Sequence, residues 1–259
     1  MVLIILGLFM LLLGGFGVGY GILGNFEALA ENSFFSKLGD HASLACIIVG
    51  GLIFLFGLIM FLIGLKKRPK VKTLQLVESA LMIAVAVVLN ELLKIPSPLG
   101  GGLTVVSMLP LVLISHRYGA GWGLFTAFIF SLIELIFGLK NVGYASTALM
   151  AAGIIFLDYI LAYSVIGLSG IFGKSRAAVA TGIAVTFTLR FICHLVCGAL
   201  IWKQWMPEEY MGMAMTNPWI YSALYNGWYM AAELVITMIV AMIIYKPLEK
   251  YFRGPAKAE

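Results

Sequence analysis

Charged residues are scarce in this sequence, which excludes an ordinary water-soluble fold. Only 11% of the 259 residues are Asp, Glu, Lys or Arg, whereas 62% are apolar. Soluble domains contain about 25% charged and about 45–50% apolar residues, and they avoid the large apolar patches that this composition would expose to water. The mean hydropathy is +1.03. The composition therefore predicts an all-α integral membrane protein.

Cysteine is also rare, and the three cysteines do not form the framework of a disulfide-rich secreted protein. Cys46, Cys193 and Cys197 all lie in apolar runs. Cys193, His194 and Cys197 have side chains of the metal-binding type, but no convincing further ligands accompany them. Small buried residues of a membrane helix are therefore the favoured interpretation. We expect no metal and no cofactor.

Signatures of soluble enzymes are missing as well. The motifs H-E-x-x-H, G-x-S-x-G and C-x-x-C do not occur. Gly170, Gly173, Lys174 and Ser175 resemble a phosphate-binding loop, but that motif requires glycine at position 168, which is leucine, and a preceding strand. The segment is instead predicted to be a turn between membrane helices. Any ATP hydrolysis must come from another chain.

Eight apolar segments are predicted to enter the bilayer as helices, because a full span needs about 20 mostly apolar residues. They cover 1–24, 43–65, 75–95, 104–116, 118–139, 147–172, 177–202 and 219–245. The fourth is short and the sixth and seventh are long, so tilted or partial spans are expected.

Basic residues indicate the orientation of these helices. If the run Lys66–Lys72 is cytoplasmic, twelve Lys and Arg residues lie inside and four outside, and Arg190, within a span, completes the total of 17. Because cytoplasmic loops carry an excess of Lys and Arg, both termini are predicted to be cytoplasmic. The net charge of +5 reflects this bias and does not indicate a nucleic-acid partner.

The same basic run divides the chain. The prediction is a two-helix transmembrane hairpin at 1–65, a basic cytoplasmic linker at 66–73, a six-helix core at 74–250 and a cytoplasmic tail at 251–259. The glycine pairs 15/19 and 17/21 have the spacing that lets membrane helices approach closely. A cleaved signal peptide is the alternative, since Ala28-Leu29-Ala30 resembles a cleavage site, but no basic region precedes the long apolar stretch.

Ionisable residues inside the predicted spans are candidates for a functional site, because each costs about 2.5–3.5 kcal/mol on insertion scales. They are Asp158, Arg190, His194 and Glu233. Glu78 and Glu134 lie nearer to helix ends, where snorkelling or water offers a simpler interpretation.

These residues and their neighbours predict a pocket for a small, flat, cationic ligand. Arg190 and His194 are four residues apart and share a helical face, and Trp202 follows two turns later. Asp158 with Tyr159, and the last segment with Tyr221, Tyr225, Asn226, Trp228 and Tyr229, are expected at a similar depth towards the outside. Aromatic faces attract cations, a carboxylate supplies the countercharge, and amide and imidazole groups provide hydrogen bonds.

Two simpler interpretations stay open at this point. Trp205, Trp219, Trp228 and Tyr229 could belong to the aromatic belt at the membrane interface. Asp158 could form a purely structural pair with Arg190.

Four stretches resemble the thiamine-specific substrate-binding (S) component of energy-coupling factor transporters, over about residues 74–250. They are GGGLTVVSMLP at 100–110 followed by RYG at 117–119, FLDY at 156–159, RFICH at 190–194 with Trp202 eight residues after His194, and YSALYNG at 221–227. Residues 1–72 have no counterpart in the basic form of this family.

The resemblance implies a binding site for thiamine near the outer face. Asp158 would face the thiazolium cation or hydrogen-bond the ligand, Trp202 would stack on a ring, and polar contacts would come from His194, Tyr221 and Asn226. Tyr159 and Arg190 complete the predicted substrate-binding residues. A tryptophan found in the first loop of some members is replaced here by glycine near Gly101, so the lid over the ligand is expected to be built differently.

The resemblance also implies a bacterial plasma membrane, a transmembrane coupling protein and two cytoplasmic ATPases as partners. Members dock through an A-x-x-x-A face on the first core helix, which Ala80 and Ala84 match before the pattern reaches Val88. Alanines four apart form a smooth strip for another helix, although packing within this chain would use the same spacing.

The leading hypothesis is therefore a thiamine-binding and translocation subunit that is not an enzyme. A stand-alone proton-coupled secondary transporter using Asp158 or Glu233 is the first alternative. An intramembrane enzyme with Asp158 and His194 as acid and base is the second.

Overall fold

The structure is a computed structural model, which describes residues 71–97 and 101–253, only the backbone at 148 and 149, and six isolated positions before them: Gly7, Gly14, Gly15, Gly51, Leu55 and Leu58. The chain divides into two compact units, Met1–Lys70 and Val71–Glu259. The predicted hairpin at 1–65, its close helix contacts and the alternative cleavage site otherwise lie outside the described residues. They stay predictions.

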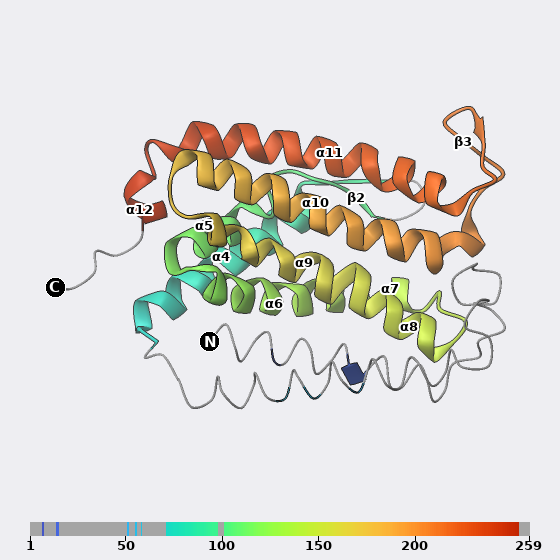
Figure 1. Ribbon diagram of the computed structural model, residues 1–259, viewed down its shortest axis with the longest axis horizontal. Coiled ribbons are helices and arrows are strands. Elements are labelled where there is room, and N and C mark those ends of the chain that lie inside the picture. Colours follow the sequence, from blue (N-terminus) through green and yellow to red (C-terminus); the bar gives the residue numbers. More distant parts are fainter. Residues whose placement is uncertain are drawn as a thin grey trace. The chain divides into compact units, whose positions relative to one another are not determined.

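The second unit is a bundle of apolar helices. Five helical segments in the described residues are long and apolar enough to cross a membrane: α4 (Thr73–Leu92), α6 (Ala120–Phe137), the composite segment Met150–Phe172, α10 (Arg176–Leu200) and α11 (Pro218–Tyr245). α6, α9 (Ala162–Ser164), α10 and α11 run side by side (Figure 1). The prediction of a multi-pass helical membrane protein is confirmed.

The composite segment changes its winding along its length. Its first residues belong to α8 (Ala148–Ile154), after which it continues as the π-helix η3 (Ile155–Leu161) and passes through α9 into the 3₁₀-helix η4 (Val165–Phe172). One continuous apolar stretch in the sequence thus contains a π-helical stretch in its middle, which is common at functional sites.

The predicted segment 104–116 differs most from expectation. Its helix, α5, covers Leu109–Tyr118 and has every residue from 109 to 116 buried. Ten residues at 1.5 Å each reach only about 15 Å, half the hydrocarbon thickness. Pro110 in the first turn and Gly119, with φ +89°, delimit it. α5 is therefore an enclosed core helix rather than a full span.

Short strands occupy two connections between long helices, and the first strand replaces the end of the predicted helical segment 75–95. β1 (Lys94–Pro96) pairs antiparallel with β2 (Gly102–Thr104), and β3 (Glu209–Tyr210) pairs with β4 (Met213–Ala214). The remaining short elements are α7 (Leu139–Val142), η5 (Trp202–Trp205) and α12 (Glu249–Arg253). Thr104, expected at the start of a helix, lies at the end of β2.

Glycines allow the helices around α5 to approach closely. A Cβ at Gly123 on α6 would overlap the Gly167 carbonyl of η4, and a Cβ at Gly167 would overlap the backbone of Gly123. Small residues at such crossings are how membrane helices gain van der Waals contact without a hydrophobic driving force. The contact places η4 directly against α6.

The segment that resembled a phosphate-binding loop is an interhelical turn, as predicted. Ser175 caps α10, with its hydroxyl accepting a hydrogen bond from the Ala178 amide. Lys174 donates to the Arg117 carbonyl over 3.3 Å. The lysine therefore contacts the end of α5 at the turn between η4 and α10.

Candidate ligand-binding site

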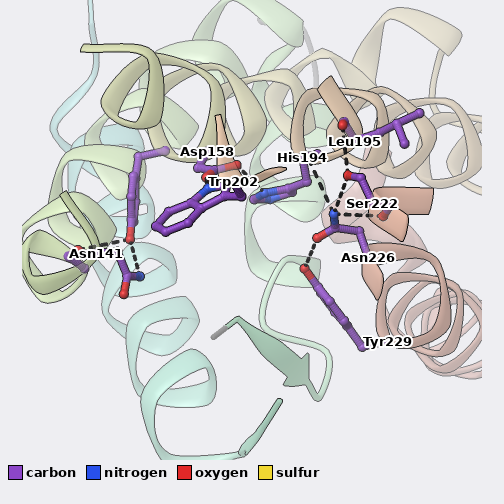
Figure 2. Close-up of polar contacts among 10 residues, drawn as sticks. Asn141, Asp158, His194, Leu195, Trp202, Ser222, Asn226 and Tyr229 are labelled. Atoms are coloured by element: carbon purple, nitrogen blue, oxygen red, sulfur yellow. Dashed lines mark hydrogen bonds and ion pairs between the residues drawn. The ribbon is translucent and has the colours of Figure 1, made fainter. Parts of the chain in front are cut away.

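Asp158 is the centre of a polar cluster formed by three elements. Its Oδ1 lies 3.0 Å from His194 Nδ1 on α10, and its Oδ2 accepts a 2.8 Å hydrogen bond from Trp202 Nε1 at the start of η5 (Figure 2). Since a carboxylate only accepts, Nδ1 of the imidazole carries the proton of the first bond. Asp158 and His194 are mostly buried, with side chains about 15% exposed. The predicted grouping of these three residues is present.

Asp158 and the neighbouring Tyr159 both lie on the π-helix η3, but their side chains bond different partners. Tyr159 OH accepts a hydrogen bond from Asn141 Nδ2 over 2.8 Å and donates to the Gly138 carbonyl over 3.1 Å. A Cβ at Gly138 would overlap the Tyr159 ring. Tyr159 is therefore fixed against the end of α6, and it packs in the same apolar cluster as Trp202.

Asn226 joins α11 to the same region. Its amide nitrogen donates to the Ser222 carbonyl at 3.0 Å and the His194 carbonyl at 3.4 Å, and its Oδ1 accepts a 2.6 Å bond from Tyr229 OH (Figure 2). All three side chains on α11 are buried. Asn226 therefore holds α11 against the turn of α10 that carries His194.

Two of the predicted site residues, Trp202 and Tyr221, take part in aromatic pairs. Trp202 lies 5.2 Å from Trp205 and 6.3 Å from Tyr144, measured between ring centroids. The predicted site residue Tyr221 is buried and lies 5.5 Å from Tyr210 and 5.7 Å from Tyr225. These are the separations of attractive aromatic pairs.

Arg190 has a different partner from the one considered in the sequence. Its Nη1 lies 2.7 Å from Glu233 Oε2, and the two side chains are 4% and 0% exposed. Glu233 Oε1 accepts a 2.6 Å hydrogen bond from Thr104. The Arg190 guanidinium also lies 5.0 Å above the Tyr163 ring. The proposed structural pair between Asp158 and Arg190 is therefore wrong, since Arg190 is neutralised by Glu233.

The hairpin β1–β2 meets α11 at two points. Thr104, at the end of β2, reaches Glu233, and Gly101 lies against Tyr229, where an added Cβ would come within 3.3 Å of the phenolic oxygen. Gly101 has φ +68°, a left-handed conformation that favours glycine. The loop that was expected to differ from its relatives thus has a backbone conformation that disfavours a tryptophan at this position. Residues 98–100 of the loop lie outside the described residues.

The interfacial-belt interpretation fits three of its four residues. Trp205, Trp219 and Trp228 are exposed, but Tyr229 is 5% exposed and hydrogen-bonded to Asn226. For Tyr229 the belt interpretation is wrong.

Glu134 is a residue whose environment was misjudged from the sequence. It is 4% exposed, and Asn90 Nδ2 of α4 donates to its Oε2 over 2.5 Å. Snorkelling or hydration therefore does not explain it. One feature of the sequence sets Glu134 apart: no basic residue lies three or four positions away on its helix to pair with it. Glu78, in contrast, forms a two-pronged pair with Arg117 at 2.5 and 2.9 Å.

Ala80 and Ala84, predicted to dock a partner, are both exposed on α4. They leave a strip on which another helix could lie. Docking itself stays a prediction.

Residues 76–253 match the family described as thiamine transporter protein. The chain belongs to this family of thiamine transporters. The match covers most of the second unit, including the Asp158 cluster, Arg190 and Asn226. It is a family of transporters and not of enzymes.

Relatives within the thiamine transporter family agree with this assignment. The chain is 30% identical over 186 residues to the thiamine transporter ThiT of Bacillus subtilis (strain 168), covering 66% of this chain and 90% of the relative. It is 24% identical over 150 residues to ThiT of Lacticaseibacillus paracasei, covering 53% and 70%. A solved structure of ThiT from Listeria monocytogenes shares the fold, with TM-score 0.56 and 23% identity over 70% of this chain and 98% of that one.

Proposed function

We propose that this chain is the thiamine-binding S subunit of an energy-coupling factor importer. The observation that carries the proposal is the cluster of Asp158, His194 and Trp202 inside a member of a thiamine transporter family. Thiamine combines a flat aminopyrimidine with a cationic thiazolium ring. Aromatic faces and buried carboxylates are the groups that bind such a molecule.

Each predicted residue except Arg190, which pairs with Glu233, has a role in this proposal. Trp202, held by Asp158, provides a ring face for stacking. His194 keeps Nε2 available for a polar group of the ligand, because Nδ1 is bonded to Asp158. Tyr221 and Asn226 form the α11 side of the site, and Tyr159 lies beside Asp158.

Energy would come from separate chains: a transmembrane coupling protein and two cytoplasmic ATPases. The exposed strip of Ala80 and Ala84 on α4 supports docking of a helix there. The inside excess of Lys and Arg supports cytoplasmic termini in a bacterial plasma membrane.

The stand-alone proton-coupled carrier is less well supported. Glu233, one of its two suggested proton sites, is neutralised by Arg190 and accepts from Thr104. Vesicles containing only this chain distinguish the two mechanisms. Thiamine uptake driven by a pH gradient alone would favour the carrier, whereas the S-subunit proposal expects binding without such uptake.

Fluorescence titration of the detergent-purified chain tests ligand binding directly. Thiamine should quench tryptophan emission in a saturable way, and Asp158→Asn and Trp202→Ala should weaken or abolish the response. Trp219→Phe, which removes an exposed tryptophan that is not among the predicted site residues, should titrate like the wild type. Absence of saturable binding to folded wild-type protein would overturn the proposal.

A further inference from the structure

Glu134 and Asn90 form a buried pair in which one oxygen of each side chain has no hydrogen-bond partner among the described residues. Asn90 is 1% exposed and Glu134 4% exposed, and one hydrogen bond of 2.5 Å joins Asn90 Nδ2 to Glu134 Oε2. Glu134 Oε1 and Asn90 Oδ1 are both buried and have no hydrogen-bond partner among the described residues. A buried ionised carboxylate is costly unless it is paired. The pair therefore lacks a positively charged or proton-donating group.

No lysine, arginine or histidine among the described residues forms an ion pair with Glu134. The ion pairs of the described residues are Arg117 with Glu78, Arg190 with Glu233, and His194 with Asp158. Glu134 takes part in none of them. Asp158, the other carboxylate near the site, already has a donor on each oxygen, His194 on one and Trp202 on the other.

Glu134 lies on the helical face that borders the candidate site. Gly138, which caps the end of α6, is four residues after Glu134 and hence on the same face, and its carbonyl accepts a hydrogen bond from Tyr159 OH. Leu135, next in the chain to Glu134, packs in the apolar cluster that contains Tyr159 and Trp202. The unpaired oxygens are therefore one helical turn away from the Tyr159 contact.

We propose that Glu134, held by Asn90, is the carboxylate that faces the positive charge of the bound ligand. Asp158 then serves as a positioning residue that orients His194 and Trp202. This inference rests on the proposed function, because it takes the thiazolium ring of thiamine as the cation. It assigns the charge recognition to α4 and α6 rather than to the π-helix.

A comparison of two ligands isolates the charge. Thiamine and an analogue whose thiazolium is replaced by an uncharged ring of the same shape are titrated against wild type and Glu134→Gln. Loss of one charge-assisted contact corresponds to about a 10- to 100-fold loss of affinity. Glu134→Gln should lose this much for thiamine and stay within about twofold for the neutral analogue. Asp158→Asn should weaken both ligands by similar factors.

Glu209→Gln is the control, because it removes an exposed carboxylate on β3. It should leave both affinities unchanged. If Glu134→Gln is not monodisperse, Glu134→Met removes the two oxygens at similar volume and gives the same readout.

The outcomes separate this inference from the proposed function. Wild type that binds thiamine, together with Glu134→Gln that still prefers the cation, overturns the inference alone. Equal loss of both ligands in folded Glu134→Gln also overturns it, because that pattern indicates a structural role. Wild type that binds neither ligand overturns the proposed function itself.

Discussion

Removing Glu233 is expected to be the most damaging single change among the charged residues of the core. Glu233 is the only ion-pair partner of Arg190 in the described part of the chain, and both side chains are almost completely buried. In Glu233→Met the volume is nearly kept, but the guanidinium loses its countercharge. Thr104 loses an acceptor as well, although its 2.8 Å contact with Ser107 remains.

The expected loss of stability follows from leaving Arg190 buried and charged without a partner. Leaving one member of a buried ion pair unpaired costs about 3–5 kcal/mol. In a domain of this size each kcal/mol lowers the melting temperature by roughly 2–4 °C, so Glu233→Met should melt roughly 6–20 °C below the wild type. The double variant Arg190→Met/Glu233→Met removes both charges and should recover most of this loss, because apolar replacement of a whole buried pair is often close to neutral.

Thermal scans of the four proteins of this double-mutant cycle, in one detergent, measure the coupling. Glu208→Gln is the control, because it removes an exposed carboxylate and should leave the melting temperature unchanged. The reasoning is refuted if Glu233→Met melts within about 1 °C of the wild type. It is also refuted if the two single losses simply add in the double variant.

Two further changes test the contacts around the site. Tyr229→Phe removes the hydroxyl that donates to Asn226 over 2.6 Å, and the unsatisfied amide oxygen should cost about 1–3 kcal/mol; unchanged melting and thiamine affinity would show that the bond contributes nothing. Gly138→Ala forces the Tyr159 ring to move and should cost about 1–3 kcal/mol through overpacking. Its control is Gly227→Ala, where the new Cβ would meet nothing closer than 3.9 Å, so a loss of stability in both variants would refute the steric explanation.

Contacts that depend on helical spacing were predictable from the sequence. His194 and Trp202 are eight residues apart, a spacing that puts two residues on nearly the same face of a continuous α-helix. In the structure α10 ends at Leu200 and Trp202 begins η5, but the two side chains still lie close together. Both do reach Asp158. Hydropathy located the long spans for a related reason, since every bilayer-crossing helix needs a long apolar stretch.

The choice of partner for Arg190 could not be predicted in the same way. Asp158 and Glu233 were both carboxylates inside spans, on two different helices. Sequence spacing fixes positions along one helix, but it fixes neither the relative depth of two helices nor their rotation about their axes. Packing of α10 against α11 decides the question in favour of Glu233.

Enclosed and irregular elements were missed for a different reason. Hydropathy reports how apolar a segment is, but not whether lipid or protein covers it, so the buried helix α5 looked like a short span. The π-helical winding around Asp158 leaves no mark in composition or periodicity. Burial of Glu134 depends on Asn90, which is 44 residues away in the sequence.

The distribution of charge around the site bears on which molecules it can accept. Glu233 is cancelled by Arg190, whereas Asp158 and Glu134 face no lysine or arginine within ion-pair distance in the described residues. Carboxyl groups therefore outnumber lysine and arginine side chains in this part of the described residues. Aromatic faces already attract a cation more strongly than a neutral pyrimidine. A carboxylate that faces the ligand adds attraction that only a cation gains, and this is a physical basis for discrimination between thiamine and its uncharged fragment.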